Sequence, residues 1–284
     1  MKKYLISIIV FLMCLLSNYS IYAQRDHHTK KSKKKEFNAI LDSANVTGSI
    51  LIYDFYSKRY YSNDFKHCKQ AFLPASTFKI TNTIIGLETG VIEDENTIFY
   101  WNGEDRPADI WEQDLNLHDA FHYSCVPCYQ EVARKIGPER MNNYLTKLNY
   151  GNMDVDSSNI DLFWLEGESK ITQYEQIDFI ERLYFGDLEI SDETVNTILD
   201  LMFIEKTEYG FLYGKTGWAI RNGQNIGWFV GCIEDPGEFL IFFATNIQPN
   251  EEFNLDMFPM IRKDISLKAL KLIVSDRTGP LAPR

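Results

Sequence analysis

The sequence predicts an α+β fold: an antiparallel sheet flanked by helices, a helical lobe beside it, and a functional site in the cleft between the two. Three observations predict this arrangement. β-rich runs lie near both ends of the chain, helical spacing fills the stretch between about residues 90 and 204, and a further helix closes the chain. Strands from distant parts of the sequence then form one sheet, with the helical insertion on one side of it.

The sheet lobe is expected at about residues 37–75 and 205–275, with two hairpin turns rich in glycine and proline at 221–223 and 235–237. Its predicted elements are a leading helix, a hairpin, a three-stranded meander and a closing helix: Glu36 to Ser43; Gly48 to Asp54 with Lys58 to Asn63; Tyr209 to Ile220, Asn225 to Glu234 and Glu238 to Ile247; Met257 to Val274.

The helical lobe is expected at about residues 76–204. A buried helix continues from Ser76 through Leu87. Three later stretches combine helical spacing with capping residues at their start, namely Pro138 to Leu148, Thr172 to Tyr184 and Ser191 to Phe203. Together the two lobes make a single domain at residues 37–275.

The net charge and the two ends of the chain indicate which partners and which cellular location to expect. A net charge of −11 over 284 residues disfavours a nucleic-acid partner. Residues 1–23 resemble a secretory signal peptide, with Lys2 and Lys3 before the apolar run from Tyr4 to Leu16 and Ala23 at a plausible cleavage site. We therefore expect a periplasmic or secreted protein that is not inserted in the membrane once the signal is removed. Residues 24–36, with the basic run Lys30 to Lys35, are interpreted as a solvated linker, and 276–284 as a loose tail.

A candidate nucleophile lies at the start of the helical lobe. Ser76 and Lys79 are three residues apart, so on a helix their side chains share one face. A serine hydroxyl needs a base to become nucleophilic, and a lysine can be that base if burial destabilises its ammonium form. The helix start also offers unpaired backbone N–H groups that can stabilise an oxyanion.

A second candidate is the stretch from Tyr123 to Gln130. Ser124, on a turn before a helix, can pass a proton to a leaving nitrogen, or it can simply cap that helix. The same stretch contains Cys125-Val126-Pro127-Cys128, the spacing of a thiol–disulfide exchanger. That chemistry needs a strand before the first cysteine, and the residues upstream look helical. Whether Cys125 and Cys128 form a disulfide stays open, and with Cys68 and Cys232 no spacing demands one.

Two further segments carry polar groups suited to a substrate. Trp164 places an indole N–H within an apolar run, where a buried donor needs an acceptor. Lys215, Thr216 and Gly217 lie in a strand pattern and offer a cation, a hydroxyl and bare backbone to an anionic substrate. The Trp218 N–H can complete an oxyanion hole with that of Ser76. Arg262 can supply a second cation for a carboxylate, and His118 with His122 lacks a third ligand for a metal.

Taken in order, these motifs resemble the class D, or oxacillinase-type, serine β-lactamases. The match runs from about Phe72 to Arg262. Class A enzymes fit less well, because the chain has no Ser-Asp-Asn and Glu166 is not followed by Leu-Asn. The motifs are Ser76-x-x-Lys79, Ser124-x-Val126, Tyr150-Gly151-Asn152, Phe163-Trp164-Leu165-Glu166-Gly167 and Lys215-Thr216-Gly217.

The resemblance implies hydrolysis of β-lactam antibiotics on a fold shared with the penicillin-binding transpeptidases. It implies that Ser76 is acylated and that Lys79 carries a carbamate formed from CO2 or bicarbonate, as N6-carboxylysine, with no metal and no other cofactor. The other implied roles are carbamate support by Val126 and Trp164, proton relay by Ser124, oxyanion donation by Ser76 and Trp218, and carboxylate binding by Lys215, Thr216, Gly217 and Arg262.

Two rivals share most of these motifs. A β-lactam-sensing receptor domain stays acylated and does not turn over, and it is normally fused to several membrane spans. A cell-wall transpeptidase shares Ser-x-x-Lys and Lys-Thr-Gly but lacks the Trp164 motif and the water-activating base. Turnover distinguishes the hydrolase from both. Substrate spectrum and oligomeric state do not follow from the sequence.

Overall fold

The structure is a computed structural model that describes residues 29–278. Its centre is a seven-stranded sheet in the order β1-β3-β2-β11-β10-β9-β8, antiparallel except for the pair β1 and β3. The strands are β1 (Lys30–Lys33), β2 (Val46–Asp54), β3 (Arg59–Ser62), β8 (Phe203–Thr207), β9 (Gly210–Arg221), β10 (Gln224–Asp235) and β11 (Phe239–Pro249). The α+β prediction is confirmed.

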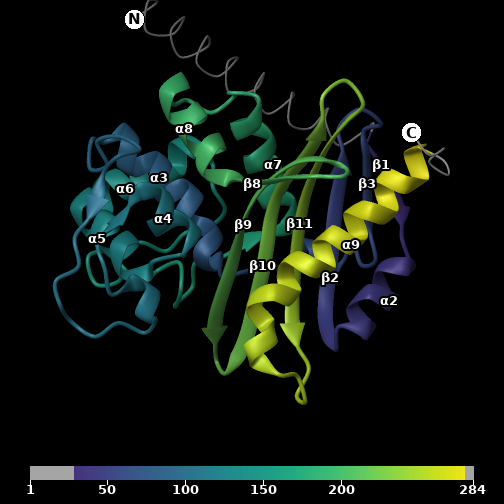
Figure 1. Cartoon of the computed structure of the whole chain (residues 1–284), viewed down its shortest axis with the longest axis horizontal. Coiled ribbons are helices and arrows are strands. Elements are labelled where there is room, and N and C mark those ends of the chain that lie inside the picture. Colours follow the sequence, from purple (N-terminus) through teal and green to yellow (C-terminus); the bar gives the residue numbers. More distant parts are fainter. Residues whose placement is uncertain (1–28, 279–284) are drawn as a thin grey trace, which may run out of the picture.

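Helices cover both faces of this sheet (Figure 1). One face packs against α2 (Glu36–Ser43) and α9 (Phe258–Thr278), and α7 (Gln173–Tyr184) lies against the other. The remaining helices gather beside β9 as the helical lobe: α3 (Phe78–Glu88), α4 (Leu117–His122), α5 (Val126–Ile136), α6 (Pro138–Leu148) and α8 (Asp192–Met202).

Short elements join these parts. Two small ladders pair β4 (Ala71–Phe72) with β7 (Ile171–Thr172) and β5 (Ile98–Phe99) with β6 (Leu115–Asn116). Single 3₁₀ turns are η1 (His67–Lys69), η2 (Ala75–Thr77), η3 (Asp109–Trp111) and η4 (Leu255–Met257). The β4–β7 ladder lies just before the Ser76 segment and therefore ties it to the start of α7.

Local sequence explains several element ends. Thr172 accepts a hydrogen bond from the Glu175 N–H and the Glu175 carboxylate accepts one from the Thr172 N–H, a capping box that starts α7. Pro138 occupies the first turn of α6, where its missing N–H costs nothing. Helix α3 is buried from Phe78 through Gly86, so it is the central helix of the helical lobe.

Most predicted elements are confirmed to within two or three residues, including the meander β9–β10–β11 and its two turns. The linker interpretation is wrong for Lys30–Lys33, because this run forms β1 and pairs with β3. The tail does not begin at residue 276 either, since α9 continues to Thr278 and Arg277 donates a 3.0 Å hydrogen bond to Asp54. The expected signal peptide at 1–23 and residues 279–284 lie outside the described residues.

Candidate active site

Ser76 and Lys79 meet at the junction of η2 and α3. The Lys79 Nζ donates to Ser76 Oγ across 2.9 Å, and neither residue is more than 7% exposed. Ala75, directly before the serine, has a left-handed φ of 54°, a conformation that costs energy in a residue other than glycine. Its N–H donates to the Trp164 carbonyl at 2.9 Å, which helps to hold the strained turn.

Burial makes Lys79 a potential base. Removal of water from the ammonium form, and secondarily the nearby charge of Lys215, hold the Lys79 pKa well below its usual value. The side chain is fully buried and forms no ion pair with a carboxylate of residues 29–278; its contacts include the serine hydroxyl and the ring of Tyr129, whose centroid is 5.2 Å from Nζ. A neutral amine beside a hydroxyl can accept its proton.

A second Ser–Lys pair faces the first from the other side of the site. Lys215, on β9, donates to Ser124 Oγ at 2.9 Å, and Ser124 has a left-handed φ of 58° between α4 and α5. Burial, and then the charge of Arg262, lower the pKa of Lys215 to about 7. Ser124 does not cap α5; Cys125 does, because its sulfur accepts the Cys128 N–H at 3.2 Å.

The edge of strand β9 that β8 leaves unpaired lies next to η2, the turn that contains Ser76. Its pairing with β8 ends at Tyr213, and beyond it residues 214–221 pair with β10 while η2 lies against them. A Cβ on Gly217 would lie 3.1 Å from the Pro74 carbonyl oxygen and 3.2 Å from the Ala75 Cβ, which is tighter than ordinary contact, so glycine at this position favours the close approach of the strand. Thr216 is half-buried.

Arg262 is buried and bonded to the backbone near β9. It is 7% exposed and its guanidinium donates to three backbone carbonyls, among them Gly217 O at 2.6 Å. Burial lowers its pKa to about 10. A guanidinium has five N–H donors, so three such bonds leave N–H groups for a carboxylate while fixing β9 in place.

Trp164 and Val126 lie in different surroundings. The Trp164 indole is fully buried and stacks on Phe78, with ring centroids 5.6 Å apart. Its Nε1–H has no acceptor among residues 29–278, and a buried donor left unpaired is costly. The indole N–H can therefore donate a hydrogen bond to a group that is not part of the polypeptide. Val126, in the first turn of α5, is half-buried.

Tyr129 was missed by sequence reasoning. Its ring lies under the Lys79 amine, and its hydroxyl bonds Thr83 Oγ1 at 2.8 Å, one helical turn after Lys79. The Asn82 amide also donates to the Tyr129 carbonyl at 3.1 Å. The spacing of Lys79 and Thr83 on α3 was a usable signal for a shared face, but nothing local pairs α3 with α5.

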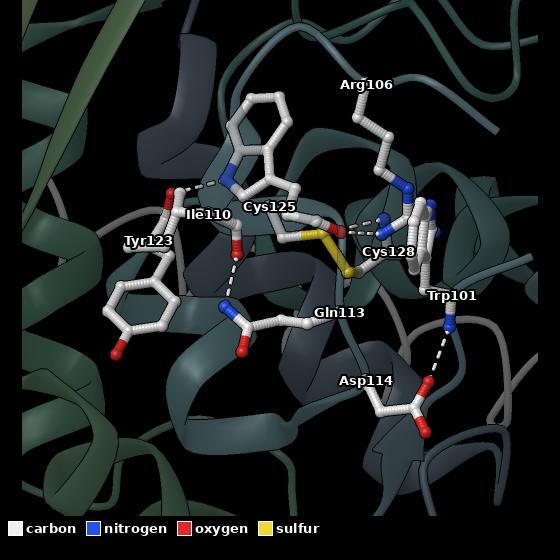
Figure 2. Close-up of a disulfide and its surroundings, with 9 residues drawn as sticks. Trp101, Arg106, Ile110, Gln113, Asp114, Tyr123, Cys125 and Cys128 are labelled. Atoms are coloured by element: carbon white, nitrogen blue, oxygen red, sulfur yellow. Dashed lines mark hydrogen bonds between the residues drawn. A yellow bond between two sulfur atoms is a disulfide. The ribbon is translucent and has the colours of Figure 1, made fainter. Parts of the chain in front are cut away.

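Cys125 and Cys128 form a disulfide at the start of α5, which the sequence left open. In the view of Figure 2 it lies between Ile110 and Tyr123 on one side and Trp101 on the other. Both cysteines are no more than 2% exposed, whereas the reactive cysteine of a thiol–disulfide exchanger is partly exposed. Helix α4 precedes the pair, whereas a thiol–disulfide exchanger would have a strand there.

Comparisons with known proteins agree with this geometry. Residues 29–265 match the penicillin binding protein transpeptidase domain. The chain is 37% identical to beta-lactamase OXA-48 of Klebsiella pneumoniae over 85% of this chain and 90% of that protein. It belongs to the class D β-lactamases. A class D enzyme from Sebaldella termitidis has a similar structure, with a TM-score of 0.81 and 37% identity over 86% of this chain and 98% of that one.

A second relative shows a similar degree of identity. The chain is also 37% identical to beta-lactamase OXA-10 of Pseudomonas aeruginosa, over 84% of this chain and 88% of that protein. Residues 29–278 hold no cluster of three side chains suited to a metal ion, and none of their helices combines the length and apolar character that a membrane crossing requires. Glu166 is exposed, so this class D β-lactamase does not place that carboxylate as a buried base.

Proposed function

We propose that the protein hydrolyses β-lactams through an ester on Ser76, with Lys79, in carbamylated form, as the general base for both acylation and deacylation. The observation that carries the proposal is the 2.9 Å contact between Ser76 Oγ and a fully buried amine whose pKa is strongly lowered. Burial favours the neutral form of such an amine, and only a neutral amine adds CO2.

The residues around Lys79 suit a carbamate. The Trp164 N–H has no acceptor among the described residues and is proposed to donate to the carbamate, and Val126 is proposed to line it together with the Tyr129 ring, which lies under the amine. A carbamate on the lysine nitrogen supplies an oxygen base where the bare amine supplies nitrogen. It also places a negative charge near the positive charge of Lys215, which contributes to the low Lys79 pKa.

The other side chains take complementary tasks. Ser76 Oγ attacks the lactam carbonyl, and the backbone N–H groups of Ser76 and Trp218 stabilise the oxyanion, because Gly217 brings β9 against the turn before the serine. Ser124, bonded to Lys215, passes the proton to the leaving nitrogen. Water then hydrolyses the ester.

The substrate carboxylate is bound on β9 and α9. Lys215, Thr216 and the N–H groups of Arg262 not used on backbone carbonyls provide the donors, and the open edge at 214–221 lets the substrate lie along Gly217. We further propose that the chain is exported, to the periplasm or the medium, and acts there as a soluble enzyme.

Turnover tests this function against the acylate-and-stop alternatives. Purified protein is mixed with a chromogenic cephalosporin, and we expect many turnovers per enzyme, faster with added bicarbonate. Lys79→Ala should abolish turnover, while Lys147→Ala on α6 should not. A stoichiometric burst that then stops favours the sensor or transpeptidase, and steady hydrolysis indifferent to both bicarbonate and Lys79→Ala contradicts the carbamate.

A further inference from the structure

The disulfide lies between two contacts that the proposed chemistry needs. Cys125 is the N-cap of α5 and Cys128 is in its first turn, with Cα atoms 5.4 Å apart. On one side of the pair, Ser124 bonds Lys215; on the other, Tyr129 underlies Lys79. The first turn of α5 therefore connects the surroundings of both catalytic lysines.

The segment that carries Arg106 and Trp111 restricts how the first turn of α5 can adjust. The Trp111 indole donates to the Tyr123 carbonyl at 2.9 Å, directly before Ser124, and Arg106 Nη1 donates to the Trp111 carbonyl at 2.5 Å. Figure 2 shows Arg106 and Tyr123 on the two sides of the disulfide. On the helix side, the Tyr129 hydroxyl is bonded to Thr83.

Reduction changes the shape of this buried site. Two thiols need more separation than two bonded sulfurs, and a close-packed interior passes such a change to its neighbours. The neighbour best able to relax is the left-handed Ser124, because its backbone conformation persists only while the surroundings enforce it. Relaxation of that residue moves the hydroxyl away from Lys215.

We propose that Cys125 and Cys128 are positioning residues for hydrolysis, acting through Ser124 and Tyr129, and that full turnover requires them to be joined. The inference rests on the proposed roles of Ser124 and Lys79. Formation of the bond removes two electrons and two protons from the cysteines, and a disulfide oxidant such as glutathione disulfide takes them up to become two thiols.

The test is turnover measured across glutathione redox buffers. Purified enzyme is equilibrated at stepped ratios of reduced to oxidised glutathione, and the fraction of joined Cys125 and Cys128 is read by alkylation and peptide mass. We expect kcat to fall about tenfold in step with that fraction, since small misplacements of catalytic groups cost rate. KM should change less than about twofold, because the carboxylate-binding side chains lie on β9 and α9.

Two variants make the result specific. Cys125→Val with Cys128→Val removes the bond and both thiols, so its kcat should not depend on the buffer. Cys68→Ala with Cys232→Ala removes the two free buried cysteines of the described residues and should keep the wild-type response. Circular dichroism at the assay temperature should show folded protein in every buffer.

Three results would overturn the inference: constant kcat in wild type while the joined fraction goes to zero, a redox response that persists in the double valine variant, or loss of activity that follows loss of folded signal. None of these results contradicts the proposed function, which is tested separately on the fully oxidised enzyme by its turnover and by the effects of bicarbonate and of Lys79→Ala.

Discussion

Lys79 and Lys215 are both buried lysines, and their surroundings separate their tasks. Lys79 is fully buried beside Ser76 and an aromatic ring, so the charged form is strongly disfavoured. Lys215 reaches Ser124 from β9, the strand proposed to bind the substrate, and its pKa of about 7 leaves it available in both forms near neutral pH. One suits a base, and the other suits a cation that attracts a carboxylate.

Trp164→Phe should weaken carbamylation and leave the apolar wall in place. The change removes the unpaired buried N–H but keeps a ring to stack on Phe78. A hydrogen bond to a charged group contributes about 1.5–3 kcal/mol, which converts to roughly a 10- to 100-fold rise in the bicarbonate concentration needed for half-maximal kcat. Bicarbonate titration of kcat measures it, with 13C NMR of labelled bicarbonate as a direct readout.

Trp101→Phe is the matched control, because its indole N–H is already bonded to the Glu104 carbonyl at 2.8 Å, outside the site. An unchanged bicarbonate requirement in Trp164→Phe would show that the indole does not contact the carbamate.

The pH profile should report the charge of Lys215. For a substrate with a carboxylate, kcat/KM reflects the free enzyme, in which Lys215 loses its proton above pH about 7. We therefore expect kcat/KM to fall as the pH rises through about 7 and 8. Lys215→Arg keeps a cation at every pH tested, so its fall should move to higher pH even if its maximum is lower. An identical basic limb in both proteins would remove Lys215 from this role.

At the scale of elements, β9 is the part of the site best anticipated by the sequence. Its alternating pattern and the Gly-containing turn at 221–223 predict a hairpin strand, and the structure pairs β9 with β10 from Phe211 to Arg221. Residue types alone also indicate Gly217 as a point of close approach. Ser76 and Lys79 were likewise found because three-residue spacing on a helix is a local property.

Other features were beyond the sequence because they depend on tertiary contacts. The lysine-rich β1 has no apolar alternation, and it is a strand only because it pairs with β3. The position of Tyr129 under Lys79 depends on how α5 packs against α3. The carbonyl contacts of Arg262 depend on where α9 crosses the sheet. Cys-x-x-Cys serves several chemistries, so spacing left the disulfide open.

Gly217→Ala should separate β9 from the nucleophile turn. The added methyl would meet the Pro74 carbonyl, the Ala75 Cβ and the Thr77 Cγ2 at 3.1–3.2 Å, atoms that belong to a packed turn and yield little. Displacement of the strand moves the Trp218 N–H from the oxyanion, so kcat/KM should fall about 10- to 100-fold. Steady-state kinetics measure it.

Ile220→Ala, on the same strand but 59% exposed, should leave kcat/KM within about twofold. If Gly217→Ala retained wild-type kcat/KM, the close approach of β9 to η2 would have no part in catalysis.

At the scale of the whole molecule, the two buried lysines lower the free energy of unfolding. Each must be neutral or hold an uncompensated charge in the folded state, while both are solvated when the chain unfolds. The seven-stranded sheet and its two apolar layers offset this cost. Stability should therefore depend on pH through the lysines themselves.

Raising the pH from 7 to 9 should stabilise the fold through Lys215. Its pKa is about 7 when folded and 10.5 otherwise, so between these values the unfolded chain binds one more proton. The free energy of unfolding then rises with pH, at up to about 1.4 kcal/mol per pH unit; Lys79 acts in the same direction. Above pH about 10, buried tyrosines with raised pKa values, such as Tyr129, oppose the trend.

Urea unfolding at pH 7, 8 and 9 in CO2-free buffer measures the slope, because the amine of Lys79 is then unmodified. Lys215→Met removes one titrating group, so the variant should lose nearly all of the pH-dependent rise in unfolding free energy that Lys215 contributes. The stability of the variant at pH 7 should be equal to or above that of wild type. Subtraction of the two curves cancels the exposed groups that titrate in both proteins. Parallel curves would mean that Lys215 titrates alike in the folded and unfolded chain. A pKa lowered to about 7 in the folded protein would then be wrong for Lys215.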